Sequence, residues 1–153
     1  MTTKADRLPS MLAPFKGARP PAPAWFDRAV AVLPERSHVT VAGARIEVLS
    51  WGQRGKPGLL LLHGGMAHAD WWSFIAPYFA ATHRVAALSW SGMGGSEWRP
   101  KYTIDTYVEE LMAVAEFAGL FEAKAKPLVL AHSFGGFPTM RRRACTATGS
   151  AAS

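Results

Sequence analysis

The sequence predicts an α/β fold whose sheet begins with an antiparallel hairpin and continues with parallel strands. Three observations support this prediction. Residues 37–52 alternate apolar and polar side chains on both sides of Gly43, which is typical of a β-hairpin. Continuous apolar runs at 59–62 and 128–130 are typical of strands buried on both faces. Helical periodicity separates these runs, and alternating strands and helices build a mainly parallel sheet.

The first half of the chain supplies a helix, the hairpin and the first buried strand. Residues 25–33 carry apolar side chains at helical spacing, and Pro34 is expected to end that helix. After the hairpin, the run at 59–62 leads directly into glycines. Residues 70–80 again place bulky apolar side chains on one helical face, so we expect a helix there.

The second half continues the alternation of strand and helix. Residues 84–90 are predicted to form a strand. Residues 103–120 carry an apolar stripe, and Thr103 is a residue type that caps helices. The run at 128–130 is the last predicted strand. Ligands of such sheets bind at the carboxyl ends of the strands, where three short motifs of this sequence lie.

Composition divides the chain into three parts. Residues 1–23 are predicted to be a flexible, proline-rich arm, and residues 24–140 an α/β domain. Residues 141–153 are predicted to be a low-complexity tail that is disordered or out of frame.

The net charge of +6 lies at the two ends of the chain. Residues 1–20 hold four basic residues and one acidic residue, and residues 141–143 are three arginines, whereas residues 21–140 hold ten of each sign. The domain therefore has no electrostatic reason to bind nucleic acid. Cys145 is the single cysteine, and no run reaches the roughly 18 apolar residues of a membrane span. We expect a cytoplasmic protein with no membrane partner.

The first motif, Ala131 to Gly135, reads AHSFG at the end of the last predicted strand. Small residues around Ser133 suit a sharp strand-to-helix turn that exposes a nucleophile. The alternative is an ordinary turn with a capping serine.

The second motif, His63 to Gly65, follows the strand at 59–62. Acyl transfer develops negative charge on a carbonyl oxygen, and backbone amides can stabilise it. One amide would come from Phe134, and the other from Gly65 or, alternatively, Met66. The imidazole of His63 is expected only to hydrogen-bond the loop.

The third motif, residues 89–96, is rich in glycine but lacks the lysine and the following helix of a phosphate cradle. We therefore predict no nucleotide, no other cofactor and no metal.

Together the three motifs resemble the α/β-hydrolase superfamily over about residues 37–140. His63-Gly64-Gly65 matches its oxyanion turn, Ser91 to Ser96 its loop after the fourth strand, and Ala131 to Gly136 its nucleophile elbow. The resemblance implies a three-layer sheet, truncated here after about strand five, and a serine hydrolase acting on small esters or related carbonyl compounds.

Two positions depart from the family pattern, since Ser89 replaces a frequent Asp and Ala131 replaces the usual first Gly. Serine at 133 implies acyl-enzyme chemistry. It points away from epoxide hydrolases and haloalkane dehalogenases, in which the resemblance implies a carboxylate nucleophile.

The family places an acid and then a histidine after the nucleophile, but no Asp, Glu or His follows Ser133. A serine hydroxyl is weakly nucleophilic without a base. His132 should point away from the site, and His68 has no evident carboxylate partner. The chain is therefore expected to be inactive or nearly so.

A reading frame shifted near Met140 would explain the change in composition. The strand at 128–130 would then be a hydrophobic edge, open to self-association. Two alternatives stay open: a half-domain completed by another chain, and a non-catalytic binding module. The crevice of such a module would be lined by Trp71, Trp72 and Trp90, and the substrate pocket of the hydrolase hypothesis by the same three tryptophans and Gly64. These tryptophans also suit simple core packing.

Overall fold

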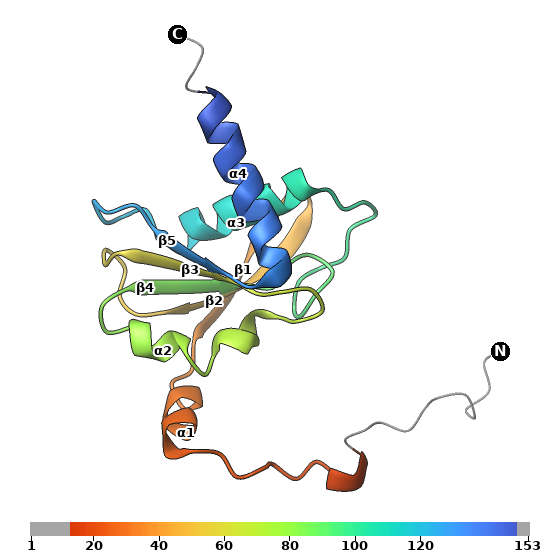
Figure 1. The fold of residues 1–153 in the computed structure, drawn as a ribbon, viewed down its shortest axis with the longest axis vertical. Coiled ribbons are helices and arrows are strands. Elements are labelled where there is room, and N and C mark those ends of the chain that lie inside the picture. Colours follow the sequence, from red (N-terminus) through yellow and green to blue (C-terminus); the bar gives the residue numbers. More distant parts are fainter. Residues whose placement is uncertain (1–12, 150–153) are drawn as a thin grey trace, which may run out of the picture.

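The computed structural model describes residues 13–149, which form one mixed sheet with helices on both faces (Figure 1). The helices are α1 (Ala24–Val30), α2 (Ala76–Phe79), α3 (Ile104–Phe117) and α4 (Gly136–Gly149), with 3-10 turns η2 (Ala13–Phe15), η3 (Ala69–Trp72) and η4 (Ser133–Gly135). The strands are β1 (Glu35–Val41), β2 (Ala44–Trp51), β3 (Gly58–Leu62), β4 (Arg84–Leu88) and β5 (Leu128–Ala131).

The sheet has five strands in the order β1-β2-β4-β3-β5. β1 pairs with β2, and β2 with β4, in antiparallel fashion, whereas β3 runs parallel to both β4 and β5. Ala42 and Gly43 join the hairpin with φ of +43° and +80°, which is the backbone of a two-residue turn between twisted strands. The predicted fold class is confirmed.

The two faces of the sheet hold separate apolar clusters, so the domain has three layers. Leu60, Leu62 and Leu88 pack on one face with α3. Leu61 and Val85 pack on the opposite face, where η3 and α2 lie (Figure 1). Because successive side chains of a strand point to opposite faces, continuous apolar runs are what a doubly covered strand requires.

The helix expected at residues 70–80 is split into η3 and α2. Ile75 lies between them with φ of −122° and ψ of −32°, and Pro77 stands in the first turn of α2. Proline lacks the N–H that would continue an earlier helix and fits best in a first turn, so the segment starts a new helix there.

α3 begins where the sequence indicated, since Oγ1 of Thr103 accepts a hydrogen bond from the amide of Thr106 at 3.1 Å. The buried face of α3 differs from the predicted apolar stripe in one respect, because the side chain of Glu110 is fully buried. This glutamate lies among the apolar side chains of the stripe, and its partners are described below.

The segment expected to be a low-complexity tail continues α4 as far as Gly149. Arg141 pairs with Asp105 of α3 at 2.8 Å, and Nε of Arg142 donates to Sδ of Met112 at 3.4 Å. α4 thus packs on α3. Residues 1–12 and 150–153 of the predicted arm and tail lie outside the described residues, and the frameshift stays a prediction.

Candidate active site

Ser133 is the second residue after the end of β5, and it has a φ of +48°. A non-glycine residue rarely adopts this left-handed backbone, and such strain is typical of functional turns. The amide of His132 donates to the carbonyl of Leu62 at 2.9 Å, and the amide of Gly135 donates back to the carbonyl of His132 at 3.0 Å. These bonds fix the turn against β3 and leave Ser133 exposed.

Gly135 explains why a small residue is needed behind the serine. A Cβ at this position would lie 2.9 Å from both Cβ and the carbonyl oxygen of Leu62, and 3.0 Å from the carbonyl oxygen of His63. The start of α4 can therefore approach β3 only because Gly135 has no side chain.

Gly64 brings the glycine turn after β3 next to the nucleophile. A Cβ on Gly64 would lie 2.7 Å from Nδ1 of His132 and 3.2 Å from Cβ of Ser133. Gly65 has open space around it, and Met66 has φ of +60°. The structure therefore places the predicted oxyanion turn against the predicted nucleophile.

His63 holds the turn in place, as expected. Nε2 of His63 accepts a hydrogen bond from the backbone amide of Trp90 at 3.1 Å. The backbone carbonyl of His63 accepts one from the indole N–H of Trp90 at 3.0 Å. Since Nε2 accepts, Nδ1 carries the proton and donates to the carbonyl of Gly64 at 2.6 Å. Burial lowers the pKa of His63, which favours this neutral form.

A buried carboxylate, Glu47 of β2, organises the glycine-rich loop after β4. Its Oε2 accepts from Oγ of Ser89 at 2.7 Å and from the amide of Gly95 at 3.0 Å, while Oε1 accepts from Arg36 at 2.5 Å. Burial opposes ionisation, but these hydrogen bonds hold the pKa of Glu47 below its ordinary value. The loop amide that could bind a phosphate thus already binds a carboxylate of the protein.

The serine that departs from the family pattern has a structural role. Oγ of Ser89 donates to Glu47 and accepts from the amide of Ala69 at 3.0 Å, so it connects the loop after β4 to η3. A hydroxyl both donates and accepts, which a carboxylate at this position does only when protonated.

Glu110 fixes the same loop from α3. Its Oε2 accepts from the amide of Ser91 at 3.1 Å, and its Oε1 accepts from Nε of Arg99 at 2.9 Å. Sequence reasoning missed both Glu47 and Glu110. The alternation of the hairpin places Glu47 at a polar position, and Glu110 lies outside the predicted apolar stripe, so the sequence pattern contains no signal that either side chain is buried.

The three predicted pocket tryptophans occupy different places. Trp71 is exposed and stacks on the imidazole of His132, with ring centres 6.0 Å apart, so it lies beside the nucleophile turn. Trp90 is fully buried against His63 and Phe134, and Trp72 is nearly buried in the opposite cluster. Gly64 and Trp71 therefore border Ser133, whereas Trp72 and Trp90 form parts of the core.

His68 has a carboxylate neighbour that the sequence did not reveal. Its Nδ1 lies 3.5 Å from Oδ2 of Asp70. The hydrogen bond from Arg36 is the main reason that the pKa of Asp70 is lowered. Among residues 13–149, however, neither His68 nor any other imidazole or carboxylate is hydrogen-bonded to Oγ of Ser133.

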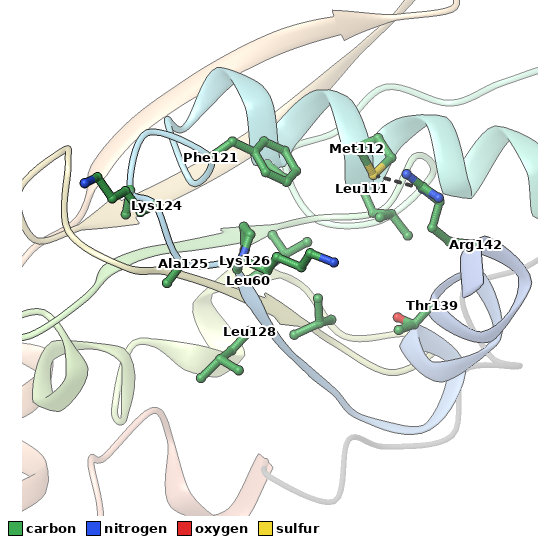
Figure 2. A pocket seen from close by; sticks show the side chains of 14 residues that line it. Leu60, Leu111, Met112, Phe121, Lys124, Ala125, Lys126, Leu128, Thr139 and Arg142 are labelled. Atoms are coloured by element: carbon green, nitrogen blue, oxygen red, sulfur yellow. Dashed lines mark hydrogen bonds between the residues drawn. The ribbon is translucent and has the colours of Figure 1, made fainter. Parts of the chain in front are cut away.

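Two hollows are open to ligands or partners. A groove of about 950 Å³ lies between α3, α4 and β5, with Leu60, Leu111 and Leu128 among its walls (Figure 2). A second hollow of about 500 Å³ adjoins Met66 at the carboxyl ends of β3 and β4. Residues 13–149 contain no cluster of His, Cys, Asp or Glu suited to a metal ion, and none of their helices has the length and hydropathy needed to cross a bilayer.

A mixed sheet with a serine turn after β5, seated on a glycine turn after β3, defines the class of α/β hydrolases. A model of the alpha/beta hydrolase family matches residues 59–152. The chain belongs to this family.

Relatives and solved structures agree with this assignment. The chain is 29% identical over 98 residues to epoxide hydrolase 4 of Homo sapiens, covering 62% of this chain and 26% of that protein. It is similar to epoxide hydrolase A from Mycobacterium thermoresistibile at 27% identity and a TM-score of 0.62, covering 71% of this chain and 34% of the other. It is also similar to the thioesterase domain from the curacin biosynthetic pathway, at 27% identity and a TM-score of 0.57, covering 67% and 38%. The chain thus spans about a quarter to two fifths of the length of these proteins.

Proposed function

We propose that this chain carries the nucleophile and oxyanion half of a serine hydrolase site. Ser133 would attack a carbonyl carbon, and the amides of Phe134 and Gly65 would stabilise the oxyanion, with Met66 as the alternative donor. One observation carries the proposal: the strained Ser133, at φ of +48°, sits directly against the Gly64 turn.

A hydroxyl nucleophile favours carbonyl substrates over epoxides. Serine attack on an ester or thioester breaks its C–O or C–S bond, releases the alcohol or thiol and gives an acyl-enzyme, which water can hydrolyse. Attack on an epoxide would instead give an ether, which water does not cleave under mild conditions. Similarity to a thioesterase domain supports the carbonyl class, whereas similarity to epoxide hydrolases supports the shared fold and a small-molecule substrate.

For this chain on its own we expect little or no turnover. A serine needs a base to take its proton, and no described imidazole is hydrogen-bonded to Ser133. In a serine protease, loss of the histidine lowers kcat about 10⁶-fold, while the oxyanion hole and binding retain a rate about 10³ to 10⁴ times that in water.

The test is hydrolysis of 4-nitrophenyl acetate by the purified chain, with intact mass measured to detect an acetyl group on Ser133. We expect slow acetylation that Ser133→Ala abolishes, and hardly any turnover after it. Acetylation that is equal in the variant would exclude Ser133 as the nucleophile. Rapid, Ser133-dependent turnover would instead show that a base is present and that the expected inactivity is wrong.

A second candidate is a half-domain completed by another polypeptide. The groove beside β5 favours it, because Leu128, Val129 and Leu130 are 61%, 43% and 44% exposed on the outermost strand. An open apolar strand edge is a template for pairing with another chain.

The open edge of β5 also predicts that the purified chain is monomeric only when dilute and that its self-association depends on this edge. Sedimentation at several concentrations, with Val129→Lys as the edge variant and Val32→Lys as an exposed control, tests it. Identical association by both variants would contradict a role for the β5 edge.

A further inference from the structure

The hollow of about 500 Å³ beside Met66 is built from the segments that follow two neighbouring parallel strands. Met66 and His68 follow β3, and Ser91 to Gly94 follow β4, while Tyr102 and Tyr107 close the side toward α3. Its volume lies in the range of sites for small molecules. Since Ser133 follows β5, parallel to β3, this hollow opens at the same end of the sheet.

The walls of this hollow are aromatic and sulfur-containing, and they bear no fixed charge. Trp98, Tyr102, Met66 and Met93 line it, together with the imidazole of His68. Met66 is 99% exposed and Trp98 80% exposed, which is unusual for large apolar side chains gathered at one site. The groove beside β5 differs, because Lys124, Lys126 and Arg142 line it.

Tyr102, on one side of the aromatic wall, is held in place before any ligand binds. The hydroxyl of Tyr102 accepts from the amide of Arg99 at 2.9 Å, and its ring stacks on Tyr107 at 6.0 Å with an interplanar angle of 19°. Gly92, at φ of +78°, leaves room for this ring, since a Cβ there would lie 2.6 Å from the Tyr102 hydroxyl. A preformed wall loses little conformational entropy on binding.

A row of rings connects this hollow to the nucleophile elbow. The ring of Tyr107 meets that of Phe134 edge to face at 5.1 Å, and Phe134 follows Ser133. A flat group stacked in the hollow would therefore pack against the same row of rings that contacts the side chain of Phe134.

We infer that this hollow binds a neutral aromatic ring of the substrate, held between Trp98 and Tyr102 and next to the Met66 amide. The assignment of this ring to a substrate of Ser133 rests on the proposed function, whereas the binding of a ring does not. Methionines beside aromatic walls accept flat groups through soft, polarizable contacts. The absence of Lys, Arg, Asp and Glu from the lining disfavours a charged ring.

The test is binding of 2-naphthol to the full chain, followed by amide chemical shifts. We expect a dissociation constant on the order of 1 mM, as is usual for a ligand of this size in an open site. The shifts should concentrate in residues 66–68 and 91–98. Trp98→Ala should weaken binding about tenfold, and trans-2-decalol, which has the same carbon skeleton without aromatic faces, should bind several-fold more weakly.

The matched control is Trp25→Ala, which removes an equally large, partly exposed indole from α1, away from the hollow. It should leave the affinity unchanged within twofold. Equal affinity of the wild type and Trp98→Ala, equal binding of 2-naphthol and trans-2-decalol, or shifts concentrated at 128–130 would each overturn the inference.

Ser133→Ala separates the two proposals, because it removes the nucleophile and leaves the hollow intact. If 2-naphthol binds at 66–68 and 91–98 while acetylation proves independent of Ser133, the proposed function fails and the ring site stands. If Ser133 is acetylated but 2-naphthol does not bind at these segments, the ring site fails alone.

Discussion

β4 and β5 are the two parallel neighbours of β3, and they differ in how deeply their residues are buried. Every residue of β4 is buried, whereas three of the four residues of β5 are exposed. Beyond β4 lies β2, whose Glu47 binds the segment that follows β4, while no described strand pairs with β5 on its other side. A continuous apolar run such as LVLA indicates a strand suited to burial on both faces. Whether the strand is buried depends on the strands and helices that lie next to it.

The largest loss of folding stability is expected from Glu110→Ala, because Glu110 binds the segment that follows β4. This change leaves the guanidinium of Arg99, only 6% exposed, without its carboxylate, and frees the amide of Ser91. Breaking a buried ion pair by removing one partner costs about 3–5 kcal/mol. Urea unfolding followed by circular dichroism measures it. Glu109→Ala, at an exposed neighbouring position, should change stability by less than about 0.5 kcal/mol.

A direct comparison of the two strands comes from leucine truncation. Leu88 in β4 is fully buried, so Leu88→Ala should lower the free energy of unfolding by about 2–5 kcal/mol. Leu130 in β5 is 44% exposed, so Leu130→Ala should cost about 1 kcal/mol or less. Equal losses in the same urea titrations would mean that β5 is covered in solution, as self-association would achieve.

A moderate effect is expected at the elbow, where β5 gives way to α4. Gly135→Ala forces a methyl group into the backbone of Leu62 and His63, and overpacking of this kind costs about 1–3 kcal/mol. Gly136→Ala, one residue later, has open space and should be neutral or slightly stabilising. A thermal melt of both variants checks this, and equal melting temperatures would argue against close contact between the elbow and β3.

The smallest effect concerns pH and the ion pairs of Arg36. The pKa values of Glu47 and Asp70 lie below their ordinary values, so the folded chain binds fewer protons than the unfolded chain in acid. The stability that results from these lowered pKa values is present above the pKa values of the unfolded chain, near pH 4. It is lost as the pH falls through the pKa values of the folded chain.

Arg36→Gln should therefore flatten the acid dependence of stability. The loss at pH 7 should be about 1 kcal/mol or less, because the pair with Asp70 is partly exposed and screened. Urea midpoints between pH 3 and pH 7 measure it. Arg28→Gln, at an exposed position with no ion pair among residues 13–149, is the control and should keep the wild-type slope.

The sequence predicted the order of strands and helices because periodicity and glycine positions are local signals. The hairpin turn at Gly43, the cap at Thr103 and the run at 59–62 all lie where expected. The break at Ile75 was missed because the apolar stripe runs on across Pro77 as if one helix continued.

The site was predictable only in part. Ser133 and Gly64 carry motif signals, and they lie together in the structure. The carboxylate beside His68 could not be foreseen, since an Asp two residues away faces a His only in particular loop backbones. The burial of Trp90 depends on tertiary contacts with Tyr107 and Phe134, which lie far along the chain.

The hydrogen bond from the Gly95 amide to Glu47 has a consequence for hydrogen exchange. Glycine-rich loops usually exchange their amide protons quickly, because they open without disturbing the core. Here the Gly95 amide donates to the buried carboxylate of Glu47, so its proton exchanges only when this hydrogen bond opens. We therefore expect this loop amide to exchange more slowly than a loop amide without a hydrogen bond, whereas the β5 amides that face away from β3 should exchange quickly.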